Sequence, residues 1–386
     1  MSYLRAFTRD VCLALALCVA APLVAEEPAA IAPPALPKVT SKSHYLVDFT
    51  TSKVLSASAA DVQLPPASLT KLMTAYLVFG ALESGRIRLD DRAHVSTKAW
   101  RTGGTRMFIE VNSDVAIDDL LHGLLIQSGN DAAVALAEHV AGSVDAFVVE
   151  MNTAAQKLGM RNTVFKNPHG LPARGHYTSA RDLAVLAKAI IDEFPDFYGI
   201  YAEREFSYNG IAQNNRNALL ARDPSVDGLK TGYTESAGYC LATSAKRDGM
   251  RLIAVVLGAP SPRVRNDGAQ KLLDYGFANF ETHKLYSAGQ ELDNARVWGG
   301  EVAFAGLGPK EDIYVTIPRG GYPKLAAKMD VLAQLAAPLT RGTAVGEVSI
   351  SFDGAPLLKS PVIVLTNVTD GGLWARLRDE LNLFSE

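Results

Sequence analysis

Apolar positions over the first two thirds of the chain recur mainly with the period of helices, interrupted by strand-like runs. The most apolar helical segment covers residues 68–84. Two prolines precede it and Gly85 follows it, which predicts a helix buried in the middle of a domain. Similar patterns predict further helices over residues 117–126, 131–141, 179–191 and 271–280, and strands over residues 44–48, 53–55, 230–233, 238–245 and 250–257.

After about residue 282 the pattern changes to short strands separated by turns. Val348, Ile350 and Phe352 alternate with polar residues, which is the period of a half-buried strand. An Asp-Gly pair at Gly354 predicts a hairpin there. We therefore expect a first domain over residues 39–282 and a small β-rich domain over residues 283–369. The polar stretch 209–217 is expected to be irregular.

The first 38 residues have the composition of a targeting segment and a linker. Arg5 and Arg9 precede an apolar run over residues 11–21, and small residues follow near Ala25. This layout predicts a secretory signal peptide over residues 1–25, too short for a membrane span. The Pro/Ala-rich residues 26–38 are expected to form a linker.

The last stretch, residues 370–386, is amphipathic. Its apolar side chains fall on one face of a helix: Leu373, Trp374, Leu377, Leu381 and Phe384. This helix either packs on its own domain or lies in the surface of a membrane as an anchor. The pattern alone leaves both interpretations open.

Composition narrows the class of protein. The chain has 386 residues, 48% of them hydrophobic and 20% charged, which is enough for two domains with sizeable cores. A net charge of −3 without any Lys/Arg-rich run argues against nucleic-acid binding. Cys12 and Cys18 would leave with the signal peptide, so Cys240 alone cannot form an intramolecular disulfide. The seven histidines show no metal-ligand spacing, and we predict neither a metal nor a cofactor.

Ser68 and Lys71 are the first candidate site residues. They are three positions apart in the first turn of the buried helix, so they share a face. The helix dipole and burial both disfavour a lysine cation there and lower its pKa, as a base near neutral pH requires. The same helix end favours a developing alkoxide on the serine. The alternative is a serine N-cap with a lysine that reaches solvent.

Two further polar elements could converge on this pair. Ser128 and Asn130 occupy a predicted turn between helices, where they could relay a proton and hold an amide, although Ser-Gly-Asn is also ordinary turn chemistry. Lys230 and Thr231 precede Gly232 on a predicted strand. A glycine there would let a peptide pair closely with the strand, and Lys230 would lower the pKa of Lys71 by repulsion.

In this order, Ser-x-x-Lys, Ser-x-Asn and Lys-Thr-Gly resemble the motifs of the penicillin-recognising serine enzymes. The resemblance extends to the low-molecular-mass D-alanyl-D-alanine carboxypeptidases of the penicillin-binding protein 5 type, and it covers roughly residues 40–370. The stretches that carry this resemblance are PASLTKLMTAY, LLIQSGNDAAVALAEHVAGS, HGLPARGHYTSARDLA, VDGLKTGYTESAGYCLATSA and IYVTIPRG.

The resemblance implies an α+β fold, with an antiparallel sheet flanked by helices in a β-lactamase/transpeptidase-like domain and a small all-β domain behind it. It implies that Ser68 is acylated, with Lys71 as its base and Ser128 as proton shuttle. It further implies that the backbone N–H groups of Ser68 and Tyr233 form the oxyanion hole. The remaining implied substrate contacts are Asn130, Lys230, Thr231, Gly232 and Arg265.

The sequence departs from the family in two places. Tyr233 stands where histidine is common, which leaves the deacylation rate open, and the loop 102–107 looks short, which could alter access to the site. His169 belongs to the family pattern, and we expect it to have a structural role.

Other functions use some of the same residues. A class A β-lactamase would need a Glu-x-x-Leu-Asn stretch between Asn130 and Lys230, which the chain lacks. An endopeptidase or transpeptidase acting on cross-links would use the same site residues. A non-catalytic wall-binding scaffold would not need all of them. The expected protein is thus an exported serine D,D-carboxypeptidase at the periplasmic face of the cytoplasmic membrane, with peptidoglycan stem peptides as substrate and β-lactams as covalent inhibitors.

Overall fold

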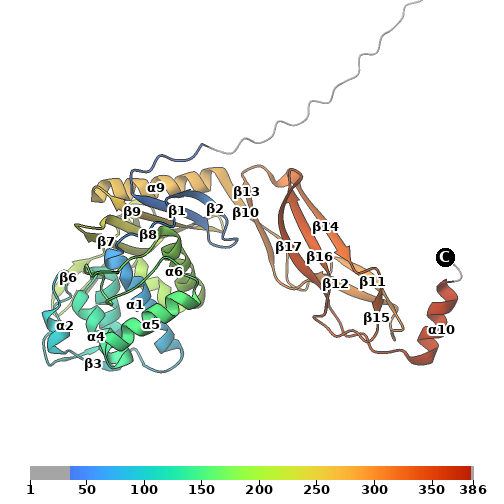
Figure 1. Ribbon diagram of the computed structural model, residues 1–386, viewed down its shortest axis with the longest axis horizontal. Helices are drawn as coiled ribbons and strands as arrows, with labels where there is room; N and C mark the ends of the chain where they lie inside the picture. The colour runs from blue at the N-terminus through green and yellow to red at the C-terminus, as the bar shows by residue number, and fades with distance from the viewer. Residues whose placement is uncertain (1–34, 384–386) are drawn as a thin grey trace, which may run out of the picture. The chain divides into compact units, whose positions relative to one another are not determined.

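The structure, a computed structural model, describes residues 35–383. The predicted signal peptide and residues 26–34 of the predicted linker lie outside the described residues. Within this range, a five-stranded antiparallel sheet has the order β2-β1-β9-β8-β7 (Figure 1). Its strands are β1 (Ser43–Asp48), β2 (Val54–Ser58), β7 (Val226–Thr234), β8 (Gly238–Arg247) and β9 (Met250–Ala259).

Helices cover both faces of this sheet, and the alternation of side chains along the strands explains why. In β9, Leu252 and Val256 pack toward helix α9, whereas Ile253 and Val255 pack toward the helices on the other face. The sheet is therefore buried on both sides (Figure 1). The helices are α1 (Lys71–Glu83), α2 (Thr97–Arg101), α3 (Ile117–His122), α4 (Asn130–Ala141), α5 (Val144–Lys157), α6 (Ala180–Glu193), α7 (Pro195–Tyr198), α8 (Leu219–Arg222) and α9 (Pro262–Asn279).

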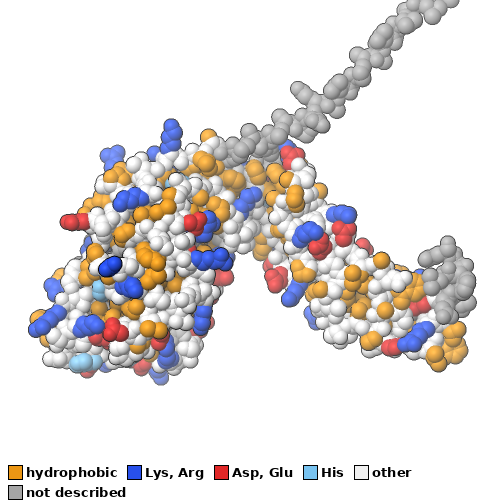
Figure 2. All heavy atoms as spheres, viewed as in Figure 1, with side chains coloured by type: hydrophobic (Ala, Val, Ile, Leu, Met, Phe, Trp, Pro, Cys, Tyr) orange, Lys and Arg blue, Asp and Glu red, His pale blue; other side chains and the backbone are white. Residues whose placement is uncertain are grey.

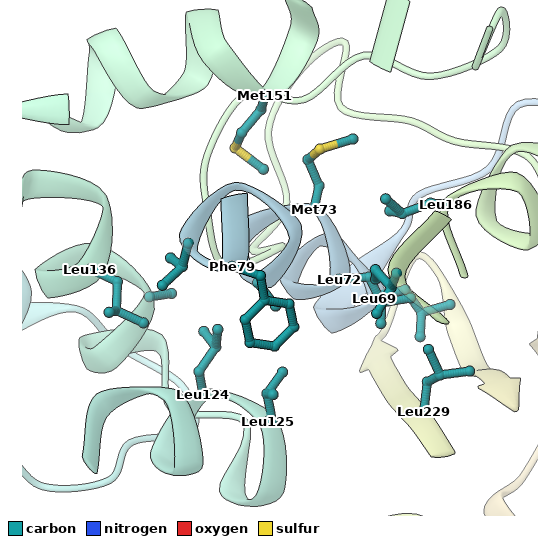
Figure 3. Close-up of a cluster of buried hydrophobic side chains, with 14 of the residues drawn as sticks. Leu69, Leu72, Met73, Phe79, Leu124, Leu125, Leu136, Met151, Leu186 and Leu229 are labelled. Atoms are coloured by element: carbon teal, nitrogen blue, oxygen red, sulfur yellow. The ribbon is translucent and has the colours of Figure 1, made fainter. Parts of the chain in front are cut away.

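The apolar segment that starts at Ser68 is the centre of this domain. It begins as the 3₁₀ turn η1 (Ala67–Thr70) and continues as α1. Figure 3 shows its side chains packed against neighbouring helices and β7. This confirms the buried helix predicted from the sequence. The labelled core residues are Leu69, Leu72, Met73, Phe79, Leu124, Leu125, Leu136, Met151, Leu186 and Leu229.

The remaining strands form the expected β-rich part. A six-stranded sheet has the order β14-β16-β17-β12-β11-β15, and β10 pairs with β13. Val348 and Ile350 are buried as the alternation predicted. The strands are β10 (Phe280–Tyr286), β11 (Asp293–Trp298), β12 (Phe304–Pro309), β13 (Ile313–Pro318), β14 (Leu325–Val331), β15 (Leu335–Ala336), β16 (Ala344–Phe352) and β17 (Ala355–Val364), and helix α10 (Gly372–Leu383) follows.

Two local predictions were wrong. The stretch 209–217 is not irregular throughout, because β5 (Glu205–Tyr208) and β6 (Ile211–Asn214) form a hairpin across Asn209-Gly210, both at positive φ. The helix expected over residues 271–280 begins at Pro262, after the cap Ser261. The first part of α9 is polar and partly exposed, so its hydrophobic pattern becomes visible only near Leu272.

Membrane-spanning potential was examined for the described helices. None of them is by itself long and apolar enough to cross a membrane. The helices α4 and α5 satisfy the criteria of length and composition only as a pair, across a bend of 85°. Most of the α4 side chains are buried inside the protein.

Candidate active site

The segment before α1 is packed so tightly that it fixes the backbone around Ser68. Ala67 has φ +50°, a conformation that non-glycine residues rarely adopt. A Cβ on Gly170 would lie 1.8 Å from the Ala67 carbonyl oxygen, so the loop that carries His169 can pass here only because residue 170 is glycine. Ser68 forms no N-cap, because the cap positions of η1 and α1 are Pro66 and Thr70.

Lys71 is completely buried beside Ser68. Its Nζ donates to Asn130 Oδ1 at 2.6 Å and to the His169 carbonyl at 2.8 Å, and lies 3.3 Å from Ser68 Oγ. Burial lowers the pKa of Lys71 well below its ordinary value, and the charge of Lys230 lowers it further. The lysine therefore does not reach solvent, and its amine is held next to the hydroxyl in an environment that favours the neutral form.

The turn between α3 and α4 brings the second motif to the same place. The π-helical turn η2 (Gly123–Gln127) ends at Ser128, which has φ +73°. Ser128 is 3% exposed, and its Oγ has no hydrogen-bond partner among the described residues. Asn130 opens α4, and its Nδ2 donates to the Gly103 carbonyl at 2.7 Å. Asn130 thus connects Lys71 to the loop 102–107.

Asp131 binds the backbone at the end of the loop 102–107. The sequence analysis did not identify this residue. Its carboxylate accepts hydrogen bonds from the backbone N–H groups of Met107 at 3.0 Å and Phe108 at 2.9 Å. Phe108 has φ +69° and is half exposed. A carboxylate that receives successive N–H groups fixes such a turn without a cation. Asp131 therefore ties the backbone next to Asn130 to the rim of the site.

Strand β7 brings the third motif against the start of α1. A Cβ on Gly232 would lie 3.0 Å from the Ser68 nitrogen and 3.2 Å from the Leu69 nitrogen. Residue 232 is therefore small because β7 packs on this backbone. The sequence analysis had related the glycine to the approach of a peptide. Thr231 is buried beside it. The ring of Tyr233, in contrast, is 51% exposed.

Cations gather around Lys71. Lys230 is 2% exposed, and burial, together with the charges of Arg216 and Arg265, lowers its pKa to about 7. Arg265 reaches the site from α9, is 7% exposed and donates from Nε to Asn266. The sequence analysis missed Arg216, because nothing in its polar surroundings marks it. Its proximity to Lys230 arises only from the fold.

Two comparisons with family models now bear on this arrangement. The model described as D-alanyl-D-alanine carboxypeptidase, Peptidase S11, matches residues 29–261, and the model of the penicillin-binding protein 5 C-terminal domain matches residues 280–370. The chain belongs to the D-alanyl-D-alanine carboxypeptidase family. It is a serine-type D-Ala-D-Ala carboxypeptidase, and its α+β fold with a transpeptidase-like domain and a C-terminal all-β domain is confirmed.

Individual relatives of this carboxypeptidase cover nearly the same length. It is 43% identical over 351 residues to the D-alanyl-D-alanine carboxypeptidase DacC of Escherichia coli (strain K12), a match that covers 89% of this chain and 88% of the relative. The crystal structure of penicillin-binding protein 5 from Haemophilus influenzae superposes with a TM-score of 0.83, at 40% identity, over 87% of this chain and 99% of that one. The ampicillin-bound penicillin-binding protein D2 of Listeria monocytogenes superposes with a TM-score of 0.59, at 30% identity, over 63% of this chain and all of that one.

Two histidines of this carboxypeptidase, His169 and His176, lie next to Lys71 and Thr70. Burial lowers the pKa of His169 to about 3 and that of His176 to about 4, so both rings are neutral at physiological pH. His176 Nε2 is 2.9 Å from Thr70 Oγ1, and His169 accepts the N–H of Leu171. These contacts fit the structural role expected for His169. Among residues 35–383, no group of three or more His, Cys, Asp or Glu side chains could hold a metal ion.

Proposed function

We propose that this carboxypeptidase removes the terminal D-alanine from peptidoglycan pentapeptide stems through an acyl-enzyme on Ser68. The observation that carries the proposal is the environment of Lys71. Its Nζ is 3.3 Å from Ser68 Oγ, and its hydrogen-bond partners within the described residues are all neutral. An amine buried with neutral acceptors and facing other cations is suited to act as a base at neutral pH.

In the proposed acylation step, neutral Lys71 takes the proton of Ser68 while Ser68 Oγ attacks the carbonyl carbon of the scissile bond. The N–H groups of Ser68 and Tyr233 would stabilise the oxyanion. The tetrahedral intermediate collapses when Ser128 Oγ gives a proton to the departing D-alanine nitrogen and regains one from Lys71. The buried, unpartnered Oγ of Ser128 supports this role. Water then attacks the ester and releases the shortened stem.

Substrate binding would use the remaining polar groups. Asn130 already accepts from Lys71 and donates to Gly103, so it would exchange one of these partners for the substrate amide. Lys230, Thr231 and Arg265 would receive the terminal carboxylate. Burial lowers the pKa of Lys230 most, and the neighbouring cations Arg216 and Arg265 lower it further. A carboxylate placed among these cations would relieve their repulsion. A β-lactam presents a comparable carboxylate and carbonyl, and we expect it to acylate Ser68.

The decisive experiment is mass spectrometry of muropeptides incubated with the purified protein. Conversion of pentapeptide to tetrapeptide, and loss of this activity in Ser68→Ala, would support the proposal. Cleavage of cross-linked dimers would show endopeptidase activity as well. A folded wild-type protein that leaves pentapeptides intact and takes no fluorescent penicillin label would favour the non-catalytic scaffold.

Helix α10 supports the membrane-anchor interpretation of the C-terminus. Leu373 is 78%, Trp374 84% and Leu377 50% exposed, whereas Asp379 is 4% exposed and accepts the N–H of Gly299 at 2.6 Å. The helix therefore faces its own domain with Asp379 and the small Ala375, whereas the large apolar side chains Leu373, Trp374 and Leu377 are left exposed. Figure 2 shows the hydrophobic side chains exposed at this end of the chain. This arrangement favours a lipid surface as the partner of the apolar side.

We further propose export by the signal peptide over residues 1–25 and a peripheral position at the periplasmic face of the cytoplasmic membrane. Truncation after Asp370 should release the protein from membranes into the soluble fraction. The triple variant Leu373→Ser, Trp374→Ser and Leu377→Ser should do the same without shortening the chain. Retention of both on membranes would contradict the anchor.

A further inference from the structure

The edge strand β7 ends in an aromatic pair that the steps above do not use. The rings of Tyr233 and Tyr239 are stacked, with centroids 4.3 Å apart and planes inclined by 24°. The two residues are cross-strand partners in the β7–β8 ladder. Tyr233 directly follows Gly232, whose Cα is packed on the backbone of Ser68. The pair therefore lies one residue from a close contact between β7 and the backbone of the nucleophile.

The two rings are held to different degrees. Tyr239 is partly buried against the hydrophobic cluster between the sheet and α9, which includes Leu241 and Leu272. Tyr233 is half exposed and lies one residue before the end of β7. Among the described strands, β7 pairs in the sheet with β8 alone. Tyr239 is thus the anchored ring, and Tyr233 is the residue that the stack restrains.

We infer that Tyr239 is a positioning residue that holds the oxyanion donor. The inference rests on the proposed function, in which the N–H of Tyr233 stabilises the oxyanion. To reach the substrate, this N–H must point to the free edge of β7, where it makes no ladder hydrogen bond with β8. The stack between the two rings then provides the cross-strand restraint that backbone hydrogen bonds do not provide at residue 233.

This role has a kinetic consequence that a purely structural role lacks. A preorganised donor stabilises the charge that develops in the transition state more than it stabilises the bound substrate. A loosened donor therefore lowers kcat and leaves KM nearly unchanged. The same donor serves β-lactams, so the rate of acylation by a penicillin should fall with kcat.

The experiment compares the full-length wild type with Tyr239→Ala, Tyr239→Phe and Tyr322→Ala. Tyr322 is a matched control outside the catalytic domain, because it is 52% exposed and the only ring that it contacts within residues 35–383 is that of His283, at 4.9 Å between centroids. D-alanine release from an N-acylated peptide ending in D-Ala-D-Ala gives kcat and KM, and a fluorescent penicillin gives the acylation rate. Tyr239→Ala should lower kcat and the acylation rate about 10-fold or more, with KM within about threefold. Tyr239→Phe retains the stack and should stay within about twofold of the wild type, as should Tyr322→Ala.

Wild-type kcat and acylation rate in Tyr239→Ala, or a loss confined to KM, would overturn the inference. If Tyr239→Ala does not fold, Tyr239→Leu decides by the same criteria, because leucine keeps the apolar contact with α9 but cannot stack. A wild-type protein that is labelled by penicillin yet releases no D-alanine would contradict the proposed reaction. The labelling rates of the variants would still decide the role of Tyr239.

Discussion

Two helices of the catalytic domain begin in opposite ways. Helix α6 follows Ser179, whose Oγ accepts the N–H of Asp182 at 3.2 Å, and Asp182 places a negative charge where the helix dipole favours one. Helix α1 begins at Lys71, after the cap position Thr70, which forms no side-chain cap, and the buried amine of Lys71 lies in its first turn. Its dipole disfavours a cation at that position.

The hydrogen-bond partners of the Asp182 carboxylate complement its charge, whereas those of the Lys71 amine do not. The carboxylate of Asp182 accepts from the backbone of Asn162 and from the hydroxyl of Thr163, both at 2.7 Å. Among the described residues, Lys71 Nζ donates to neutral acceptors only, and the charge of Lys230 disfavours its cationic form. A buried polar group is structural where its surroundings complement its charge. Where the surroundings oppose the charge, as at Lys71, the charged form destabilises the fold and the neutral form is favoured. The neutral amine is the form that a general base requires.

The largest effect is expected from Lys71→Met, which removes the amine and keeps most of the shape. Without a base next to Ser68, D-alanine release and labelling by penicillin should each fall about 10³-fold or more. The steady-state rate and the labelling time course measure these losses. Turnover at the original rate in a folded Lys71→Met protein would show that another group takes the proton.

The second effect concerns the amine opposite the start of α1. Lys230→Met should stabilise the protein at neutral pH, because burial lowers the pKa of Lys230 to about 7 from the ordinary value of 10.5. Between these pH values the unfolded chain binds more protons than the folded protein, so wild-type stability rises with pH there. Below about pH 7 the destabilisation is fully present, on the order of 5 kcal/mol.

Urea unfolding at about pH 6, pH 8 and pH 10 measures this difference between wild type and Lys230→Met. The stability gap should be widest at the lowest pH and should narrow as the pH rises. Lys157→Met, at an exposed position of α5, serves as the control and should show no such narrowing. A gap that widens with pH would mean that Lys230 is stabilised, not destabilised, in its charged form.

The sequence reveals the parts of this site that are local in the chain. Ser68 and Lys71 share one helical turn, and Ser128 and Asn130 share one loop, so spacing alone groups each pair. Residues that come together only through folding show no such spacing in the sequence. Arg216 approaches Lys230 only because the segment after β6 packs beside β7, where Asn217 donates to the Gly228 carbonyl at 3.0 Å.

The fold shows the same division. Apolar periodicity predicts the buried α1 and the strands β7, β8 and β9, whose side chains have to meet a core. It does not predict the start of α9, because the first turns of that helix are polar and partly exposed. The hairpin β5–β6 was missed because its residues are mostly exposed, although the Asn209-Gly210 turn was a usable signal.

The third prediction concerns the start of α6, where the hydrogen bonds of Asp182 complement its charge. Asp182→Ala should lower the free energy of unfolding by about 2–3 kcal/mol, because the buried hydroxyl of Thr163 and the partly buried N–H of Asn162 both lose their acceptor. Asp182→Asn retains one acceptor oxygen and should cost less. Urea unfolding of the three proteins gives the ranking. If Asp182→Ala is as stable as the wild type, the complementarity of this cluster contributes nothing.

The smallest effect comes from the serines that precede the two helices. Ser179→Ala removes a cap and should lower the free energy of unfolding by about 1 kcal/mol, with D-alanine release within about twofold of the wild type. Ser68→Ala removes no cap, since Lys71 at 3.3 Å is the only hydrogen-bond partner of its hydroxyl among the described residues. The variant should leave stability unchanged while abolishing turnover. Both variants are measured by urea unfolding and by the release assay. A destabilised Ser68→Ala would contradict the contrast, because Ser68 would then support its helix as Ser179 does.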